Sequence, residues 1–157
     1  RRPMMCRLRF LLPALTLAAI ACGGDKAPEV VVDFAGAWHL RADFIYQPED
    51  VVCVVTGLTL NVVQDSSFLS GSATAGSVLC SQSGVDWPAT ETGEFILSGN
   101  ARPASVIFNL QERSGPSLTF SGPLTGSQFN GVFQGSLVVE SFNLGDVAVS
   151  GTWTASR

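Results

Sequence analysis

The residues that could carry out acid–base or nucleophilic chemistry are few and scattered. The chain of 157 residues has one histidine, His39, in the segment GAWHLRAD. If this segment is a strand, His39 points to the face opposite Trp38 and Leu40 and shares its own face with Arg41 and Asp43. A nucleophilic serine needs a base that a third group orients. A histidine in a row of charged side chains is better explained as a surface residue.

Carboxylates gather in two stretches, at Glu49-Asp50 and at Glu91 and Glu94. Paired carboxylates can act as acid and base, and acidic loops can hold calcium. Glu49-Asp50 lacks the alternating acidic and glycine spacing of a dedicated calcium loop, so both stretches are interpreted as solvated loop tips. We expect no metal site and no cofactor.

The charge of the chain excludes several classes of partner. Four of the nine basic residues lie within the first 21 positions, whereas all thirteen acids follow them. From Cys22 onward five bases face thirteen acids, a net charge of −8. This balance argues against nucleic acid, which is bound by neutralising phosphates, and against a basic patch on an anionic membrane.

Residues 1–21 are typical of an export signal. A basic head, RRPMMCRLR, precedes a twelve-residue apolar run, FLLPALTLAAIA, which is too short to span a bilayer comfortably. The next residue is Cys22, and Ala19-Ile20-Ala21-Cys22 resembles the lipobox of bacterial lipoproteins, although that family prefers leucine where Ala19 stands. An ordinary secretory signal beside an unmodified cysteine is the alternative.

The lipoprotein resemblance implies a domain organisation and a location. In that family the cysteine becomes the first mature residue and carries acyl chains, so Cys22 is the expected lipidation site. Residues 22–34 would be the lipidated N-terminus and a flexible tether, and residues 35–157 the folded domain. Because Gly23 is not aspartate, resemblance to proteobacterial sorting favours an outer-membrane lipoprotein of the cell envelope over one retained at the inner membrane.

Two of the four cysteines remain for the folded domain, Cys53 and Cys80. A hairpin turn at Ser66-Ser67 would place apolar residues opposite apolar ones, such as Leu60 opposite Ala73, and the same register sets Cys53 opposite Cys80. We therefore predict a disulfide, which would close a loop of about 28 residues and contribute roughly 3.5 kcal/mol. Two buried free thiols are the alternative. Two cysteines and one histidine cannot complete a structural zinc shell.

Alternation and turn residues predict an all-β domain. The predicted strands cover about 36–46, 51–65, 68–82, 93–99, 104–112, 117–124, 128–139 and 146–155. If each pairs antiparallel with the next, the simplest arrangement is an eight-stranded up-and-down meander barrel, which leaves no exposed edge. A two-sheet β-sandwich is the alternative. A transmembrane barrel is disfavoured because the outward positions are mostly Thr, Ser and Gln.

The predicted registers align a row of aromatic residues. Phe120 falls opposite Phe108 on one side and Phe133 on the other, Phe95 falls opposite Phe108, and Phe133 falls opposite Trp153. The sequence also places Gly57 opposite Gly76, which predicts a bend or bulge there. Trp87-Pro88, in a predicted loop over 83–92, would cover the barrel floor near Trp38.

The tripeptide Gly36-Ala37-Trp38 resembles the Gly-x-Trp that opens lipocalins and avidins. Those families are eight-stranded barrels that hold small ligands, and in lipocalins this tryptophan plugs the closed end. The resemblance concerns architecture, since no C-terminal helix follows the last strand and no set of polar residues resembles a biotin site.

No ionisable residue falls on the predicted inward face, so we do not expect an enzyme. The first hypothesis is a lipid-anchored protein that binds or carries a small apolar ligand, which enters at the end of the barrel that bears the 46–52 loop. The expected ligand contacts are Phe44, Tyr46, Leu58, Phe108, Phe120 and Phe133. The alternative is a structural or interaction lipoprotein with a solid barrel. An enclosed apolar cavity of about 300 Å³ or more would favour binding.

Overall fold

The computed structural model describes residues 31–46, 50–74, 76–90, 94–113, 115–139 and 144–157. These residues form strands and turns and no helix, so none of them belongs to an apolar helix of membrane-spanning length. The strands are β1 (Gly36–Tyr46), β2 (Val51–Asp65), β3 (Phe68–Thr74), β4 (Ser77–Gln82), β5 (Val85–Thr90), β6 (Glu94–Arg102), β7 (Ser105–Glu112), β8 (Ser117–Thr125), β9 (Gln128–Val139) and β10 (Leu144–Ser156).

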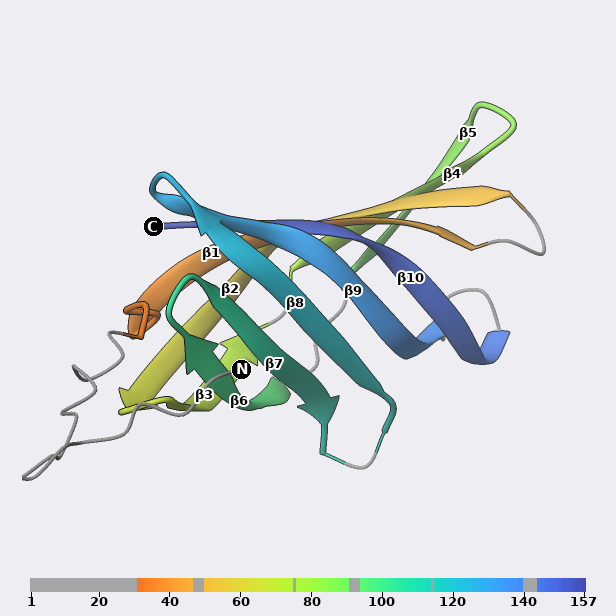
Figure 1. Cartoon of the computed structure of the whole chain (residues 1–157). Coiled ribbons are helices and arrows are strands. Elements are labelled where there is room, and N and C mark those ends of the chain that lie inside the picture. The colour runs from red at the N-terminus through yellow and green to blue at the C-terminus, as the bar shows by residue number, and fades with distance from the viewer. Residues whose placement is uncertain (1–30, 47–49, 75, 91–93, 114, 140–143) are drawn as a thin grey trace, which may run out of the picture.

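Eight of the strands close into an antiparallel barrel (Figure 1). Around the wall the order is β1, β2, β3, β6, β7, β8, β9 and β10, and β10 pairs with β1 to complete the circle. The connections run up and down between neighbours, as the sequence predicts. Closure satisfies the backbone groups that a two-sheet sandwich would leave at its edges.

The remaining two strands form a hairpin that departs from the predicted layout. The predicted strand over 68–82 is interrupted, since β3 ends at Thr74 and β4 begins at Ser77. Both segments pair with the same edge of β2. Gly57 has a φ of 77°, and a Cβ on Gly76 would lie 2.8 Å from the Leu58 amide nitrogen. The expected bend between these two glycines is therefore present.

The prediction of a loop over 83–92 is wrong. Ser83 and Gly84 have φ values of 51° and 81°, and the chain reverses at these two residues into β5. This reversal is the two-residue turn that positive φ at both positions allows. Trp87 pairs with Cys80 in β4, far along the wall from Trp38, so it does not cover the barrel floor. Figure 1 shows the β4–β5 hairpin projecting from the barrel at the upper right.

The predicted hairpin between β2 and β3 is confirmed residue by residue. The chain turns at Ser66-Ser67, and Leu60 pairs with Ala73. The same register continues past the glycine bend, so that Cys53 pairs with Cys80 and the two form a disulfide. Both cysteines are buried. The disulfide holds the β4–β5 hairpin against the first half of β2.

The predicted register between β6 and β7 is wrong by four residues. Phe95 pairs with Glu112, and Phe108 pairs with Gly99. The error arose because the turn lies at 103–104 and not at 99–103, so β6 continues to Arg102. A Cβ on Gly99 would lie 2.7 Å from the Phe108 Cβ, so the glycine provides the room in which Phe108 packs.

The predicted register between β9 and β10 is wrong by two residues. Phe133 pairs with Gly151, and Trp153 pairs with Gly131. An irregularity in the pairing between Leu144 and Asp146 shifts the register. A Cβ on Gly151 would lie 2.9 Å from the Phe133 ring, so here too an aromatic ring occupies the space beside a glycine. Both registers are shifted by an even number of residues, so every side chain keeps its predicted face.

The barrel core follows the predicted alternation. Each predicted inward residue that the structure describes is buried or half-buried, and the buried residues of the described chain include none that is polar or charged. Phe108 and Phe120 stack with ring centroids 5.0 Å apart, Phe120 and Phe133 stack at 5.1 Å, and Trp153 meets Phe108 edge-on at 5.4 Å. The pairs of Phe120 with Phe108 and Phe133 are as predicted.

Residues 31–35 close one end of the barrel, called the closed end below. Phe34 is fully buried, and its ring centroid lies 4.7 Å from that of Phe129 and 5.0 Å from that of Trp38. The Trp38 indole nitrogen donates to the Phe34 carbonyl at 3.0 Å. Trp38 thus plugs the closed end. The predicted tether over 22–34 lies outside the described residues up to position 30, and Val32 and Phe34, from its last four residues, are buried at the closed end.

Candidate ligand cavity

The end of the barrel opposite the plug is called the mouth. There the barrel separates into two walls, one formed by β1, β2, β4 and β5 and the other by β6 to β10. The pairing of β1 with β10 stops at Phe44 and Gly151, so the first part of β10 pairs with β9 alone. On the other side, β4 pairs with β2 and β5 and not with β6. In Figure 1 the β4–β5 hairpin therefore rises to one side of the mouth, while β9 and β10 turn to the other side.

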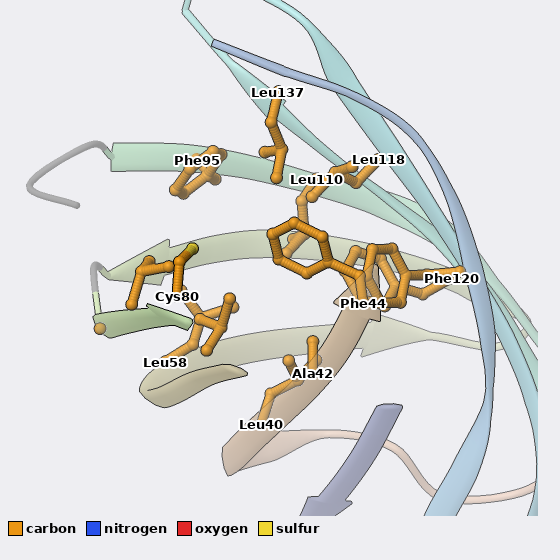
Figure 2. A pocket seen from close by; sticks show the side chains of 14 residues that line it. Leu40, Ala42, Phe44, Leu58, Cys80, Phe95, Leu110, Leu118, Phe120 and Leu137 are labelled. Atoms are coloured by element: carbon orange, nitrogen blue, oxygen red, sulfur yellow. The ribbon is translucent and has the colours of Figure 1, made fainter. Parts of the chain in front are cut away.

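An apolar cavity of about 70 Å³ lies between these two walls. Its lining residues come from both walls and carry no nitrogen or oxygen in their side chains (Figure 2). They are Leu40, Ala42, Phe44, Val55, Leu58, Gly76, Val78, Cys80, Phe95, Leu110, Leu118, Phe120, Phe133 and Leu137.

The cavity has an aromatic floor and a partly exposed apolar rim. Phe120 and Phe133 are stacked, and Phe44 meets Phe133 edge-on at 6.1 Å. These three rings are buried, whereas Phe95 and Leu137 nearer the mouth are half-buried. Since the rim leaves carbon surface in contact with water, covering it with an apolar molecule would lower the free energy by about 25 cal/mol per Å².

The structure brings most of the predicted ligand contacts together. Phe44, Leu58, Phe120 and Phe133 all line the cavity. Phe108 lies one layer deeper, fully buried beneath Phe120. It can support the floor but does not reach the cavity.

Two other predicted site residues do not line the cavity. Tyr46 is half-buried at the end of β1 and packs against the core. Cys22, the predicted lipidation site, lies outside the described residues.

The contribution of β4 to the cavity lining was not predicted from the sequence. Val55 pairs with Val78, and both line the cavity together with Cys80. The register that aligned the two cysteines also aligns these two valines, so the signal was available. It was obscured because apolar residues occupy both faces of the run from Val51 to Val55, which hides the alternation.

The ionisable groups of the described residues lie outside the cavity. His39, the predicted surface histidine, is exposed on β1. Beside it, Arg41 and Asp43 form an ion pair at 2.8 Å, which raises the pKa of the Arg41 guanidinium. Asp50 and Glu94 are exposed as well. Among the residues with described positions, no group of three potential ligands could hold a metal ion.

A second charged contact closes over the plug. Arg157 lies with its guanidinium carbon 4.5 Å from the Trp38 ring centroid and donates to the Ala35 carbonyl at 2.7 Å. It also pairs with Asp33 at 3.3 Å. The Ala35 amide and then Arg157 hold the pKa of Asp33 below its usual value.

The chain matches no protein-family model, and no curated protein sequence matches it significantly. The likeness to lipoproteins and to lipocalins therefore stands on the residues of the sequence and on the barrel architecture.

Proposed function

We propose that this protein is a lipid-anchored component of the bacterial cell envelope that binds the apolar end of a small molecule at the mouth of its barrel. The observation that carries the proposal is the cavity between the two walls, whose fourteen lining residues are all apolar. Binding sites for small molecules are typically concave and lined mainly by hydrophobic and aromatic side chains. A lining without hydrogen-bonding side chains suits a hydrocarbon.

The size of the cavity limits what it can enclose. At about 70 Å³ it is well below the 300–1,000 Å³ of a site that surrounds a whole drug-sized ligand. It is also below the enclosed volume of about 300 Å³ that would favour binding of a whole ligand. We therefore restrict the proposal to partial burial, in which a chain end enters the cavity and the remainder lies between the walls.

The attachment to the membrane would leave the mouth accessible. The segment that precedes β1 packs at the closed end, where the Val32 amide donates to the Arg102 carbonyl at 2.9 Å. An anchor at Cys22 would thus join the barrel at the end opposite the mouth. Several acyl chains on such a residue hold a protein durably, because each buried methylene contributes about 0.8 kcal/mol.

A titration with 1-octanol tests binding. The methyl resonances of Leu110 and Leu137 should shift in two-dimensional carbon–proton spectra, because both side chains line the cavity. Replacing Ala42 by leucine places three more carbons in the cavity and should weaken octanol binding at least about tenfold. Ala37→Leu is the matched control, since Ala37 lies on the same strand with its side chain exposed. Equal binding by both variants would show that octanol does not use this cavity.

The second candidate function is a solid scaffold that meets another envelope protein through its outer face or loops. The dense packing of the closed half, with Phe34 and Trp153 fully buried, and the small cavity volume favour it. If the Leu110 and Leu137 methyls do not shift up to the solubility limit of octanol, the scaffold is the better account.

The anchor has its own test. Cells that express the full chain are labelled with radioactive palmitate, and the protein is recovered and counted. Label should be lost in Cys22→Ser and retained in Cys6→Ser, because only Cys22 lies in the lipobox-like tetrapeptide. Label that persists in Cys22→Ser would refute the lipoprotein proposal.

A further inference from the structure

The charges of the barrel are divided unequally between its two ends. From residue 31 onward the chain has eleven acids and four arginines. Three of the acids balance three of the arginines away from the mouth. Two pairs, Asp33 with Arg157 and Asp43 with Arg41, are in contact. Asp65 and Arg102 each lie at a turn of the closed end.

The mouth holds the excess of negative charge. In the described part of the chain, Asp50, Glu94 and Glu112 lie at strand ends around it, and Asp86 lies on the β4–β5 hairpin. All four carboxylates are exposed, and the one arginine described at this end is Arg113.

Glu112 is the carboxylate whose place in the register lies on the same side of the sheet as the cavity lining. It pairs directly with Phe95, and paired residues of adjacent strands point to the same side of a sheet. Phe95 lines the cavity, as does Leu110, two residues before Glu112 on β7. The side chain of Glu112 turns toward the next segment, since a Cβ on Gly115 would lie 2.8 Å from its Oε2 atom. A carboxylate thus stands at the rim, directly beyond the apolar lining.

We infer that the cavity selects an amphiphile whose hydrocarbon end enters between the walls and whose head group is cationic. This inference rests on the proposed binding function and names its ligand class. The lining offers no side-chain partner to a polar group, so the head group must remain at the rim. There it meets a field of negative sign, which attracts a cation and repels an anion. A fatty carboxylate of the same length is therefore disfavoured.

Three ligands with one chain length separate the two proposals. Octylammonium, 1-octanol and nonanoate share an octyl chain and differ in their head groups, which are cationic, neutral and anionic. Titration of the unmodified protein, followed by the Leu110 and Leu137 methyl shifts, should give the order octylammonium, octanol, nonanoate in falling affinity. We expect about a tenfold difference between the two ions, since each exposed charge contributes a factor of about two to five. The difference should shrink in about 1 M salt.

Variants that each remove one carboxylate charge test whether Glu112 causes the preference for the cationic ligand. Glu112→Gln should weaken octylammonium binding about two- to fivefold and leave octanol binding unchanged. Asp65→Asn removes the same charge at the closed end, where Asp65 is exposed, and should change neither affinity.

The outcomes distinguish the two proposals. If octanol binds and the three affinities are equal, or if nonanoate binds most tightly, the charge selection is wrong while the binding function stands. If none of the three ligands shifts the cavity methyls, the binding function itself is wrong. If octylammonium binding weakens equally in Glu112→Gln and Asp65→Asn, Glu112 does not attract the head group specifically.

Discussion

Replacing Phe34 by alanine tests whether the segment before β1 is part of the folded barrel. Phe34 is fully buried, and its ring contacts those of Trp38, Phe108 and Phe129 at centroid distances of 5.0, 5.6 and 4.7 Å. A buried Phe→Ala change typically costs about 3–5 kcal/mol, because the transfer free energy and the cavity cost add. Against a total stability of about 5–15 kcal/mol, this loss would be a third or more for most domains.

Urea unfolding measures this loss directly. With a slope of about 2 kcal/mol per molar urea, a loss of about 4 kcal/mol lowers the midpoint by about 2 M. Phe68→Ala is the matched control, because Phe68 is 67% exposed and its removal should change stability by less than about 0.5 kcal/mol. If the two variants unfold at the same urea concentration, Phe34 does not plug the barrel and the account of the closed end is wrong.

Two further predictions concern the disulfide and the ion pair of Asp33 with Arg157 over the plug. Replacing Cys53 and Cys80 together by serine should lower the free energy of unfolding by roughly 3.5 kcal/mol in urea titrations, because the denatured chain loses a closed loop; an unchanged midpoint would contradict this. The pKa of Asp33 is lowered in the fold by the Ala35 amide and then by Arg157, so these two contacts stabilise the protein above the usual pKa of 3.8, and their contribution is lost as the pH falls below it. Since Asp33 is well exposed, Asp33→Asn should lower the free energy of unfolding by no more than about 0.5 kcal/mol at pH 7. This loss should shrink as the pH falls, and a loss that grows toward low pH would contradict the predicted direction.

The fold was predictable because side-chain alternation is a local property. In a strand, neighbouring side chains point to opposite faces whatever the rest of the chain does. For this reason Leu60, which is fully buried, and Val63, which is 64% exposed, could be assigned without a structure. The cysteine register was predictable for a related reason, since a short turn at Ser66-Ser67 leaves little freedom in how its two strands align.

The proposed acyl attachment and the inferred ligand class differ in how much of each the sequence alone indicates. The lipobox-like tetrapeptide ending at Cys22 is visible in the sequence alone. The basis for inferring a cationic head group was not visible there, because Glu112 lies at a strand end like several other acids. Only its pairing with Phe95 places it on the same side of the sheet as the cavity lining.

By itself, the sequence determined which faces are apolar, that the strands succeed one another as an antiparallel meander, and that Cys53 and Cys80 meet. Tertiary structure decided the exact offsets, since Phe133 packs where Gly151 leaves room on the next strand. It also decided that residues 31–35 plug one end while the other end separates into two walls. These features depend on close contacts between residues distant in sequence, whereas alternation depends only on the geometry of adjacent residues.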